Sequence, residues 1–466
     1  MPGRPSRRDG RAVAIAVVVG LALLVGCSAE GKPSSPSSPT PTTPTETPSD
    51  APVTLKLEVY GDETTVGTYR AIASAFKAEH SNVTIKIRSL PEAGAAAEKA
   101  IGEISGGNDA PDLFLLDLDR LPDAVAADVL QPVNELLEAR DVPFGDGVQR
   151  TALTAYSVDN TLACMPNDVS PYVLYYNKRL VKPRRLMDPE KPLQATSAWP
   201  WEMVLQAAAQ AAAKGARGLY IPPDLRLVQA FLVAGDGTAV DDPRAPTTLT
   251  LGNEASRDAL KTLATLTRDP LVRITPQEAD RVSPEKRFAA GKTGMLIGTR
   301  ALVPTLREVR SLNFGVAPLP SLVQDANVSE MNAYCIAKSS EHAETAADFI
   351  AFATVGDGAD IAARSGAMVP ADLDTLHSDA FLQPDQEPAS AEVFTEAARK
   401  AIPTPYSPYW LEAASSATTA LTRVLYGASL DVTSDETPAL DALLKSVDEQ
   451  SVPIFTPPEP SESPAS

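Results

Sequence analysis

The sequence is poor in the residues on which most metal sites and enzyme active sites depend. It contains three histidines, His80, His342 and His377, and none has a partner at the spacing of a metal-binding motif. No serine stands in the Gly-x-Ser-x-Gly motif of many hydrolases. The stretch AAGKTG lacks the first glycine of a phosphate-binding loop, and AGDGTAV lacks the third glycine of a dinucleotide-binding loop. We therefore expect no metal, no cofactor and no catalytic residue.

Cysteine is equally scarce, with three in 466 residues. Cys27 follows an apolar N-terminal segment, which leaves Cys164 and Cys335 as an even pair in the rest of the chain. In an exported protein such a pair is consistent with one disulfide. Two buried free thiols are the alternative, because TLACMP and NAYCIAK are both apolar stretches. The residues by themselves leave both possibilities open.

The apolar run near the N terminus is too short to be a comfortable transmembrane helix. It extends from Ala12 to Val25, about 14 residues where a membrane span needs roughly 20. Four arginines precede it, as the charged region of a secretory signal precedes its apolar region. We expect residues 1–26 to be a signal peptide. Export by the general or the twin-arginine route stays open, since Arg7-Arg8 is followed by Asp9-Gly10.

The end of this signal resembles a bacterial lipobox. In Leu24-Val25-Gly26-Cys27, small residues would let a peptidase cut before the cysteine, whose thiol would then carry a diacylglycerol. An ordinary signal with a chance cysteine is the alternative. Residues 28–52 are rich in Pro, Ser and Thr and cannot bury enough apolar surface to order themselves, so 27–52 is predicted to be a disordered tether. The tail 456–466 has a similar composition.

The charge balance is strongly acidic. The formal net charge is −19, and the first 26 residues hold four Arg and one Asp, so removing that +3 leaves −22. Such a surface disfavours nucleic acid and anionic membranes as partners. The simplest meaning of the charge is solubility outside the cell, and its sign says little about a ligand.

The first part of the body predicts a parallel α/β sheet. VTLKLEVY, from Val53, and VTIKIRSL alternate as strands, and PDLFLLD reads as a strand buried on both faces. Helix-length segments connect them, one from about Thr65 and one from Glu92 to Ile104. Open parallel sheets bind ligands at the carboxyl ends of their strands, here around Tyr60 and Asp117.

After Leu130 the pattern predicts mainly helices. WPWEMVLQAAAQAAAKG, LRLVQAFLVAG, NEASRDALKTLATLTRD and EHAETAADFIAFATV are helical, as are the segments from Ala389 to Lys400 and from Leu411 to Tyr426. Short strands are expected at Gly294 to Ile297, LNFGVAPLP and MNAYCIAK. No internal repeat of solenoid period is present.

In this order the segments resemble a known family, the extracellular solute-binding proteins of ATP-driven importers, specifically the mostly sugar-binding group typified by the maltodextrin-binding protein. The resemblance covers nearly all of residues 53–450. It is carried by VTLKLEVYGD, AFKAEHSNVTIKI, GGNDAPDLFLLD, LACMPNDVSPYVLYYNKRL, FAAGKTGMLIGTRALVPTLR, FGVAPLP and AIPTPYSPYW. The chain departs from the family pattern at EMNAYCIAK, where an aromatic-glycine strand is common, so the ligand does not carry over.

The resemblance implies a two-lobe periplasmic-binding-protein type II fold with a hinge and an interlobe cleft. Lobe one would comprise 53–165 with 312–366, and lobe two 166–311 with 367–455. Cys164 and Cys335 would lie on neighbouring hinge crossings, which favours a disulfide between them. The protein would be a monomer that captures a carbohydrate at the outer face of the bacterial membrane, held there by its lipid alone, and delivers it to importer permease subunits.

Candidate ligand-binding residues follow from strand ends, hinge crossings and aromatic loops. They are Tyr60, Asp62, Glu63, Asp117, Asp119, Asn167, Asp168, Tyr172, Arg300, Glu330, Asn332, Tyr409 and Trp410. Each has a structural alternative, for example a helix cap for Asp119 and a surface ion pair for Arg300. Tyr409 and Trp410 are the preferred aromatic platforms, because two large rings in the proline-held loop SPYW are awkward to explain by burial alone.

Two other functions remain open at the level of sequence. Asp117 and Asp119 are a carboxylate pair, which a glycosidase would use as acid and base, although an i, i+2 pair has no fixed geometry in a loop. The binding protein could also serve a sensor instead of an importer. Polyols or glycerophosphodiesters are alternatives to sugars as ligands.

Overall fold

The computed structural model describes residues 51–456, apart from 108, 187–192 and 435. The described residues all belong to one compact unit, the body of the protein. The predicted signal peptide, Cys27 and nearly all of the tether lie outside the described residues, as does the tail from residue 457. No helix in the described part of the chain is long and apolar enough to cross a membrane.

The body begins with a β-α-β-α-β unit, as predicted. Its elements are β1 (Val53–Tyr60), α1 (Glu63–Glu79), β2 (Val83–Leu90), α2 (Ala93–Gly106) and β3 (Leu113–Asp117). β1 pairs in parallel with β2 on one side and with β3 on the other. The carboxyl ends of β1 and β3 therefore reach the same edge of the sheet, and Tyr60 and Asp117 are their last residues.

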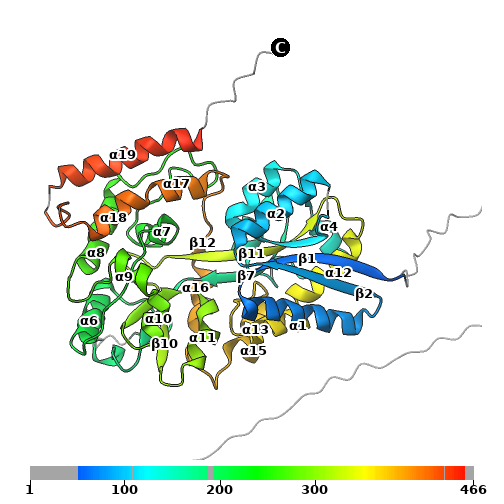
Figure 1. Ribbon diagram of the computed structural model, residues 1–466, viewed down its shortest axis with the longest axis horizontal. Helices are drawn as coiled ribbons and strands as arrows, with labels where there is room; N and C mark the ends of the chain where they lie inside the picture. The colour runs from blue at the N-terminus through cyan, green and yellow to red at the C-terminus, as the bar shows by residue number, and fades with distance from the viewer. Residues whose placement is uncertain (1–50, 108, 187–192, 435, 457–466) are drawn as a thin grey trace, which may run out of the picture. The chain divides into compact units, whose positions relative to one another are not determined.

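The long strand β11 (Asn327–Ala337) completes this sheet. It pairs antiparallel with β3, and with β7 (Met165–Pro171) over its first half. Short strands β4 (Leu130–Gln131) and β12 (Ala401–Ile402) pair with its two ends. In Figure 1, β7 and β11 run from the sheet toward the helical half of the body. These two strands are the hinge crossings.

Helices cover both faces of the first sheet (Figure 1). One side carries α1, α12 (Ala343–Thr354) and α13 (Asp357–Arg364), which pack on one another. The other side carries α2 and α3 (Leu121–Ala126), entered through the short 3-10 helix η1 (Leu118–Arg120). The remaining elements of this half are α4 (Asn134–Glu138), α5 (Arg150–Ala155), β5 (Ser157–Val158), β6 (Thr161–Leu162), α14 (Leu373–Leu376) and α15 (Asp379–Leu382).

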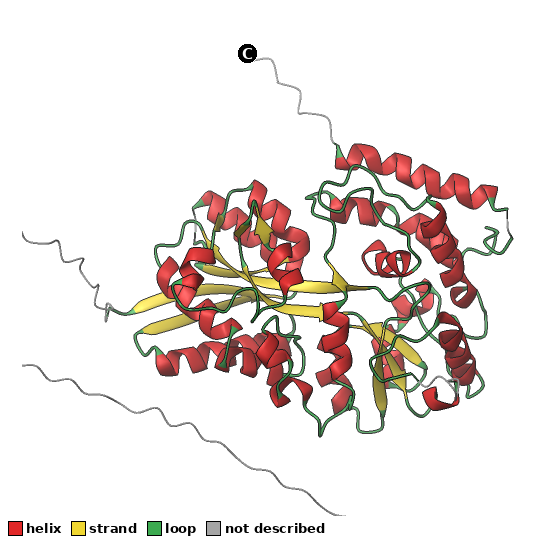
Figure 2. Ribbon diagram, turned by 180° about the vertical axis from the view of Figure 1, so that it is seen from behind, coloured by secondary structure: helices red, strands yellow, loops and turns green. Residues whose placement is uncertain are grey.

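The second half is built around a three-stranded antiparallel sheet, in which β9 and β10 lie where short strands were expected and β8 was not predicted. Its order is β10 (Phe314–Pro318), β8 (Val173–Asn177), β9 (Met295–Gly298). Helices surround it in Figure 2. They are η2 (Pro183–Arg185), α6 (Trp201–Ala212), α7 (Leu225–Ala234), α8 (Glu254–Thr267), α9 (Pro276–Arg281), α10 (Pro284–Ala289), η3 (Arg300–Leu302), α11 (Val303–Glu308), α16 (Glu392–Arg399), α17 (Trp410–Ser416), α18 (Thr418–Tyr426) and α19 (Pro438–Phe455).

Two hydrophobic core clusters are present, but the first extends into the second half, so the expected division of the chain between the lobes stays a prediction. The segment 312–318 was expected in lobe one, yet β10 pairs with β8 of the second sheet. Residues 367–398 were expected in lobe two, and Val369, Phe381 and Phe394 belong to the first core cluster, which also contains Phe314 of the second sheet. The physical reason is that the face of the second sheet carrying Phe314 packs onto the first cluster, which therefore extends past the crossings.

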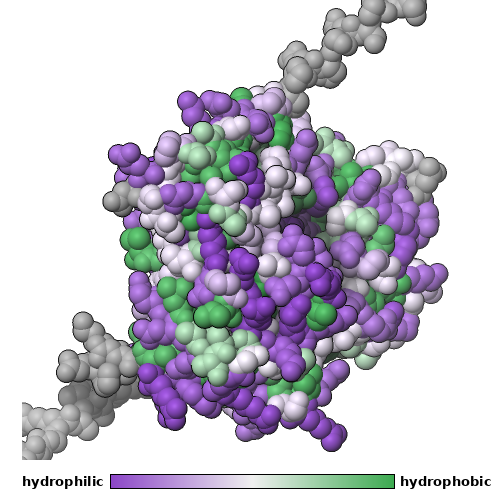
Figure 3. Space-filling view, turned by 60° about the vertical axis from the view of Figure 1, so that its left-hand side comes forward, coloured by the Kyte–Doolittle hydropathy of each residue, from purple (hydrophilic) through white to green (hydrophobic). Residues whose placement is uncertain are grey.

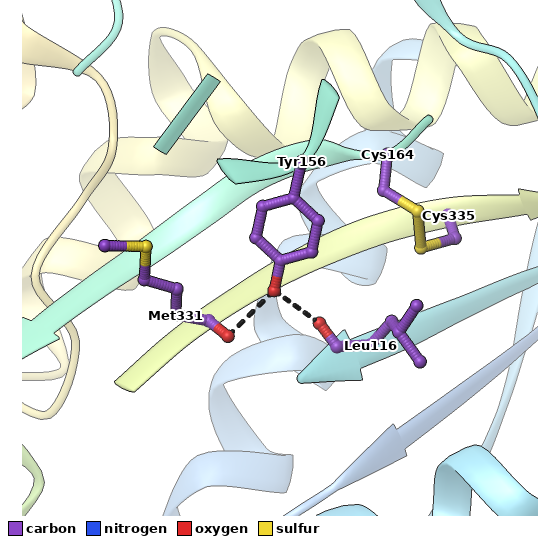
Figure 4. Close-up of a disulfide and its surroundings, with 5 residues drawn as sticks. All are labelled: Leu116, Tyr156, Cys164, Met331 and Cys335. Atoms are coloured by element: carbon purple, nitrogen blue, oxygen red, sulfur yellow. Dashed lines mark hydrogen bonds between the residues drawn. A yellow bond between two sulfur atoms is a disulfide. The ribbon is translucent and has the colours of Figure 1, made fainter. Parts of the chain in front are cut away.

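A disulfide joins the two crossings. Cys164 directly precedes β7, Cys335 lies on β11, and their Cα atoms are 4.5 Å apart across the Sγ–Sγ bond. Figure 4 shows Tyr156 beside it, with its hydroxyl donating to the carbonyls of Leu116 and Met331, both at 2.8 Å. The free-thiol alternative is thus not the one in the structure, and β3, β7 and β11 are held together at one place.

The outer surface is largely hydrophilic. Figure 3 shows hydrophilic side chains over most of the visible face, with hydrophobic ones in small separate groups. A pattern of this kind fits a protein that stays dissolved at the acidic charge given by its composition.

Candidate functional site

A polar cavity of about 350 Å³ opens at the carboxyl edge of the first sheet. Tyr60 and Met331 pack with the first core cluster, whereas Tyr172 and Val328 pack with the second, so both lobes line it. The lining residues are Tyr60, Pro91, Glu92, Ala93, Asp117, Leu118, Asp119, Tyr172, Arg226, Val328, Ser329, Glu330, Met331, Asn332 and Thr404. This position, at strand ends and between lobes, is where open α/β folds bind ligands.

Two other hollows lie on the second lobe. One of about 880 Å³ is larger, but it borders residues 187–192, which the structure does not describe, and only second-lobe elements and Ser390 line it. The other, of about 320 Å³, lies between Asp224, Arg226 and α17 and shares Arg226 with the polar cavity. We place the candidate site at the polar cavity because it alone of the three draws on the strand ends of the first sheet.

Strand register brings the central polar groups together. Asn332 of β11 stands opposite Asp117 of β3 on one side and opposite Asp168 of β7 on the other. Its Oδ1 accepts a hydrogen bond from the Tyr60 hydroxyl, and its Nδ2 donates to Asp168 Oδ2 at 3.3 Å. These contacts connect the cavity to the hinge through one amide side chain.

Asp168 is buried behind the cavity wall. Besides Asn332, its carboxylate accepts from the Ser170 hydroxyl at 2.9 Å and from the backbone N–H of Val369 at 2.7 Å. Burial raises the pKa of Asp168 to about 7, although these donors favour its charged form. It therefore orients Asn332 and lies one hydrogen bond away from the cavity.

Asp117 and Asp119 face the cavity together. Asp117 ends β3 and Asp119 lies in η1, and the backbone N–H of Asp119 donates to Asp117 Oδ1 at 2.9 Å. Burial, followed by the charge of Asp119, raises the pKa of Asp117 to about 7. Burial also raises the pKa of Asp119. The strand ends thus present two carboxyl groups that hold protons more tightly than they would in water.

Tyr172 and Glu330 form the next polar contact. Tyr172 follows β7, and its hydroxyl donates to Glu330 Oε1 at 2.7 Å. The Glu330 side chain meets solvent in the cavity, but the surrounding protein still raises its pKa by desolvation. This pair joins the second-lobe side of the cavity to the crossing strand β11.

Arg226 is the cation of the cavity lining. It lies in the first turn of α7, where Asp224 caps the helix, and its Nη2 donates to Asp224 Oδ2 at 2.9 Å. Hydrogen bonding to Asp224 raises the pKa of Arg226, so the guanidinium stays charged. The sequence marked the start of this helix but contained no signal that its first turn faces the strand ends.

The structure brings about half of the predicted ligand residues to the cavity. Those that line it are Tyr60, Asp117, Asp119, Tyr172, Glu330 and Asn332. The sequence missed Glu92, Ser329 and Thr404, which also line it, as does Arg226. Glu92 and Ser329 stand next to predicted strand ends, so proximity in sequence was a usable signal for them. Thr404 reaches the cavity only through tertiary folding.

Four other predicted residues do not line the cavity. Asp62 caps α1, accepting from the backbone N–H of Thr65 at 2.9 Å, and Glu63 pairs with Arg70 at 2.5 Å. Asn167 and Tyr409 are also absent from the cavity lining. For Asp62 the reason is local, since its carboxylate satisfies one of the free N–H groups at a helix start.

Arg300 and Trp410 were wrong as ligand contacts, because both are fully buried. The Arg300 guanidinium stacks 3.9 Å from the ring centre of Phe381 and donates to the carbonyl of that residue, and burial lowers its pKa to about 9. Trp410 is part of the second core cluster. Helix α17 begins at Trp410 and turns this ring inward, a placement that the loop-like SPYW pattern did not predict.

The donor set does not suit a metal ion. In the described part of the chain, no group of three or more His, Cys, Asp or Glu side chains is arranged to hold one. The cavity instead offers carboxylates, an amide, hydroxyls and one guanidinium around a space that would suit a small polar organic molecule.

Comparisons with known proteins identify a family and a fold for the chain. A family model described as bacterial extracellular solute-binding protein matches residues 71–383. No curated protein matches the chain significantly. The ABC substrate-binding protein Lmo0181 from Listeria monocytogenes, solved with cycloalternan, is 19% identical with a TM-score of 0.71, over 86% of this chain and 98% of its own.

Two further solved structures are similar over comparable lengths. The GacH receptor of Streptomyces glaucescens, solved unliganded and with acarbose, is 19% identical with a TM-score of 0.69, over 87% of this chain and 99% of its own. The cyclic α-maltosyl-1,6-maltose binding protein from Arthrobacter globiformis is 17% identical with a TM-score of 0.70, again over 87% and 99%. At these identities the likeness establishes the two-lobe fold.

Proposed function

We propose that this chain, which belongs to the bacterial extracellular solute-binding proteins, captures a carbohydrate in its polar cavity and passes it to a membrane importer. Proteins of this family bind solutes and do not transform them. We therefore reject the alternative that Asp117 and Asp119 are the catalytic pair of a glycosidase. The observation that carries the proposal is the composition of the cavity, to which both lobes and the strand ends contribute.

The chemistry of the lining supports a sugar. Hydroxyl groups need many placed donors and acceptors, which Asn332, Arg226 and the carboxylates provide, and the C–H face of a sugar ring packs well on the rings of Tyr60 and Tyr172. A volume of about 350 Å³ lies at the lower end of ordinary ligand sites and favours a small saccharide. Polyols and glycerophosphodiesters have similar hydrogen-bonding needs and remain the alternatives.

Binding would be coupled to closure of the two lobes. A ligand that contacts Asp117 on one side and Arg226 or Tyr172 on the other stabilises the closed state by its difference in affinity for the two states. The crossing strands β7 and β11 carry Asp168 and Asn332, so the hinge itself senses the contacts made in the cavity. The closed form would be the one that a permease recognises.

The N-terminal sequence supports ligand capture at the outer face of the bacterial cell membrane. We propose that Cys27 is lipidated and that residues 28–52 connect the lipid to the body, so that the receptor stays near its permease. A monomer is sufficient for this function, since one chain supplies both lobes. A sensor in place of the importer would use the same cavity and closure.

A thermal-shift screen tests the proposal. Mono- and oligosaccharides, polyols and glycerophosphodiesters are added to the purified protein, and a ligand at 100 times its dissociation constant should add about 2.7 kcal/mol of stability. Tyr172→Ala should abolish the shift given by the best ligand, whereas Tyr409→Ala, outside the cavity lining, should keep it. Absence of any shift, or equal shifts in both variants, would contradict a carbohydrate site in this cavity.

A further inference from the structure

The polar cavity has more negative groups than positive ones. Glu92, Asp117, Asp119 and Glu330 line it, and Arg226 is the cation among its lining residues. Arg226 is already engaged, because its Nε and Nη2 donate to the carboxylate of Asp224 at 3.2 and 2.9 Å. Arg226 still favours the charged forms of Asp117, Asp119 and Glu330, but it shares its charge with Asp224 and the lining carboxylates outnumber it.

The neighbouring cation Arg120 favours the charged form of Asp119, but it does not line the cavity. Its Nη1 is 3.2 Å from Asp123 Oδ2, on the side of α3. In the described part of the chain, no lysine or arginine forms an ion pair with Asp117, Asp119 or Glu330. Asp117 and Glu330 receive hydrogen bonds only from neutral donors, a backbone N–H and the Tyr172 hydroxyl.

Buried polar atoms without partners lie at the same place. Ser329 is 4% exposed, lines the cavity, and its hydroxyl has no hydrogen-bond partner. Asp119 Oδ1 and Thr404 Oγ1 are also buried without a well-formed hydrogen bond, although Thr404 is near enough to favour the charged form of the carboxylate. Unpaired buried groups of this kind are costly unless a ligand completes them.

The hydroxyl groups of a neutral sugar could donate hydrogen bonds to these oxygen atoms. They would leave the negative charge of the carboxylates uncompensated. Closing the lobes removes water from the carboxylates, and buried charges cost free energy unless a counter-charge accompanies them. A metal ion is a poor counter-charge here, since the described carboxylates are not arranged to hold one. An ammonium group has three donors and one positive charge, which matches several carboxylates spread around one space.

We propose that the ligand of this cavity carries a protonated amine, as an amino sugar or amino polyol does, and that Asp117, Asp119 and Glu330 receive it. This inference rests on the proposed carbohydrate function and narrows its substrate class. The hydroxyl groups of the same ligand would meet Asn332, Ser329 and Thr404, while Tyr60 and Tyr172 would pack on its ring.

A dependence on pH follows from the groups around the cavity. The acids are Asp117 on β3, Asp119 on η1, Asp168 on β7, Glu330 on β11, Glu92 before α2 and Asp224 before α7, and the bases are Arg226 and Arg120. Burial raises the pKa of Asp117 to about 7 and also raises the pKa of Asp119 and Glu330. A bound ammonium favours their charged forms, so binding releases protons, and affinity for an amine that stays protonated rises with pH up to about pH 7, the raised pKa of Asp117.

Matched sugar triplets test the inference with the full-length protein in detergent. In each triplet one carbon carries a hydroxyl, a free amine or an N-acetyl group, as in glucose, glucosamine and N-acetylglucosamine. The corresponding galactose triplet and disaccharide triplets are measured as well. Titration calorimetry should give at least tenfold tighter binding for the amine, with proton release visible as a dependence of the heat on the buffer. Equal or tighter binding of the neutral member overturns the amine but leaves the carbohydrate function standing. No binding by any member overturns both.

Variants of the cavity carboxylates test whether the site recognises the charge of the ligand or only its shape. Asp119→Asn and Glu330→Gln keep the side-chain size, and each should weaken the amine at least tenfold while changing the neutral member of the same triplet much less. Asp128→Asn is the matched control, because Asp128 is an exposed surface partner of Lys338. If Asp119→Asn and Glu330→Gln weaken the amine and the neutral sugar by the same factor, charge is not what the site recognises, and the inference fails.

Discussion

Asp117 shows how one carboxylate can serve both the fold and the site. It caps η1 through the N–H of Asp119, stands opposite Asn332 in the sheet, and faces the cavity. Its pKa is raised to about 7 from 3.8, so between about pH 4 and 7 the folded protein holds a proton that the unfolded chain has lost. The free energy of unfolding therefore falls as pH rises across that range.

We expect Asp117→Asn to stabilise the ligand-free protein at pH 8 and to leave it nearly unchanged at pH 4. Asparagine keeps the Oδ1 acceptor for the N–H of Asp119 but has no charge to bury. Melting temperatures measured from pH 4 to 8 check this, with Asp128→Asn as the surface control. Asp168 retains its own raised pKa, so the slope should decrease without vanishing. A melting temperature at pH 8 that does not rise would contradict the burial of the Asp117 charge.

Trp410 illustrates the opposite case. Its aromatic ring suggested a ligand-binding role, but its position places it in the hydrophobic core. It is fully buried against the helices of the second lobe. We expect Trp410→Ala to lower the free energy of unfolding by about 3–5 kcal/mol, the usual range for removing a large buried aromatic side chain. Urea unfolding measures the loss, and ligand affinity of the folded fraction should stay within a few fold. If Trp410→Ala lost ligand affinity while its stability stayed unchanged, Trp410 would be an aromatic platform for the ligand after all.

At the scale of elements, the disulfide ties the crossing strands beside the hinge. Cys164 and Cys335 are separated by 171 residues in sequence, so the bond closes a long loop in the unfolded chain. We expect Cys164→Ala with Cys335→Ala to lower the free energy of unfolding by about 2–5 kcal/mol and to leave ligand affinity unchanged, because neither cysteine lines the cavity.

Reduced wild-type protein is the control for that pair of substitutions. It should match the double variant in denaturant unfolding, and thiol titration of the denatured, unreduced body should find neither Cys164 nor Cys335 free. Two free thiols, or a double variant as stable as the oxidised wild type, would show that the bond is absent or contributes nothing.

At the scale of the whole molecule, the proposed function includes a lipid anchor at Cys27. We expect Cys27→Ser to move the protein from the membrane fraction to the soluble fraction, because the proposed lipid would be lost and no helix among the described residues is long and apolar enough to cross a membrane. Fractionation followed by immunodetection measures this, with Ser28→Ala as the neighbouring control. Retention of the Cys27→Ser protein in the membrane fraction would argue against lipidation.

Much of the first lobe could be predicted from local pattern. Alternation and buried runs predict β1, β2 and β3, and the spacing between them requires parallel pairing, which the structure has. The same reasoning placed Tyr60, Asp117 and Asp119 at strand ends, where they line the cavity. These features depend on contacts close in sequence, so periodicity is enough to find them.

The second lobe was harder to predict because its contacts are long-range. Short strands β8, β9 and β10 come from positions 173, 295 and 314 and form a sheet only when folded. Arg226 and Thr404 reach the cavity from elements far from β3 in sequence, and Arg300 is placed inside by aromatic rings of α15 and α16. No local pattern carries that information.

The sequence by itself determined the order of strands and helices, the acidic balance, the scarcity of metal ligands and the segments that resemble a family of binding proteins. Only the tertiary structure decided which polar groups meet. Register places Asn332 between Asp117 and Asp168, and helix α7 brings one already paired arginine to a cavity with several carboxylates. Charge excess and burial are properties of that assembly, because the desolvation that raises the pKa of Asp117, Asp119 and Glu330 comes from the folded protein around them.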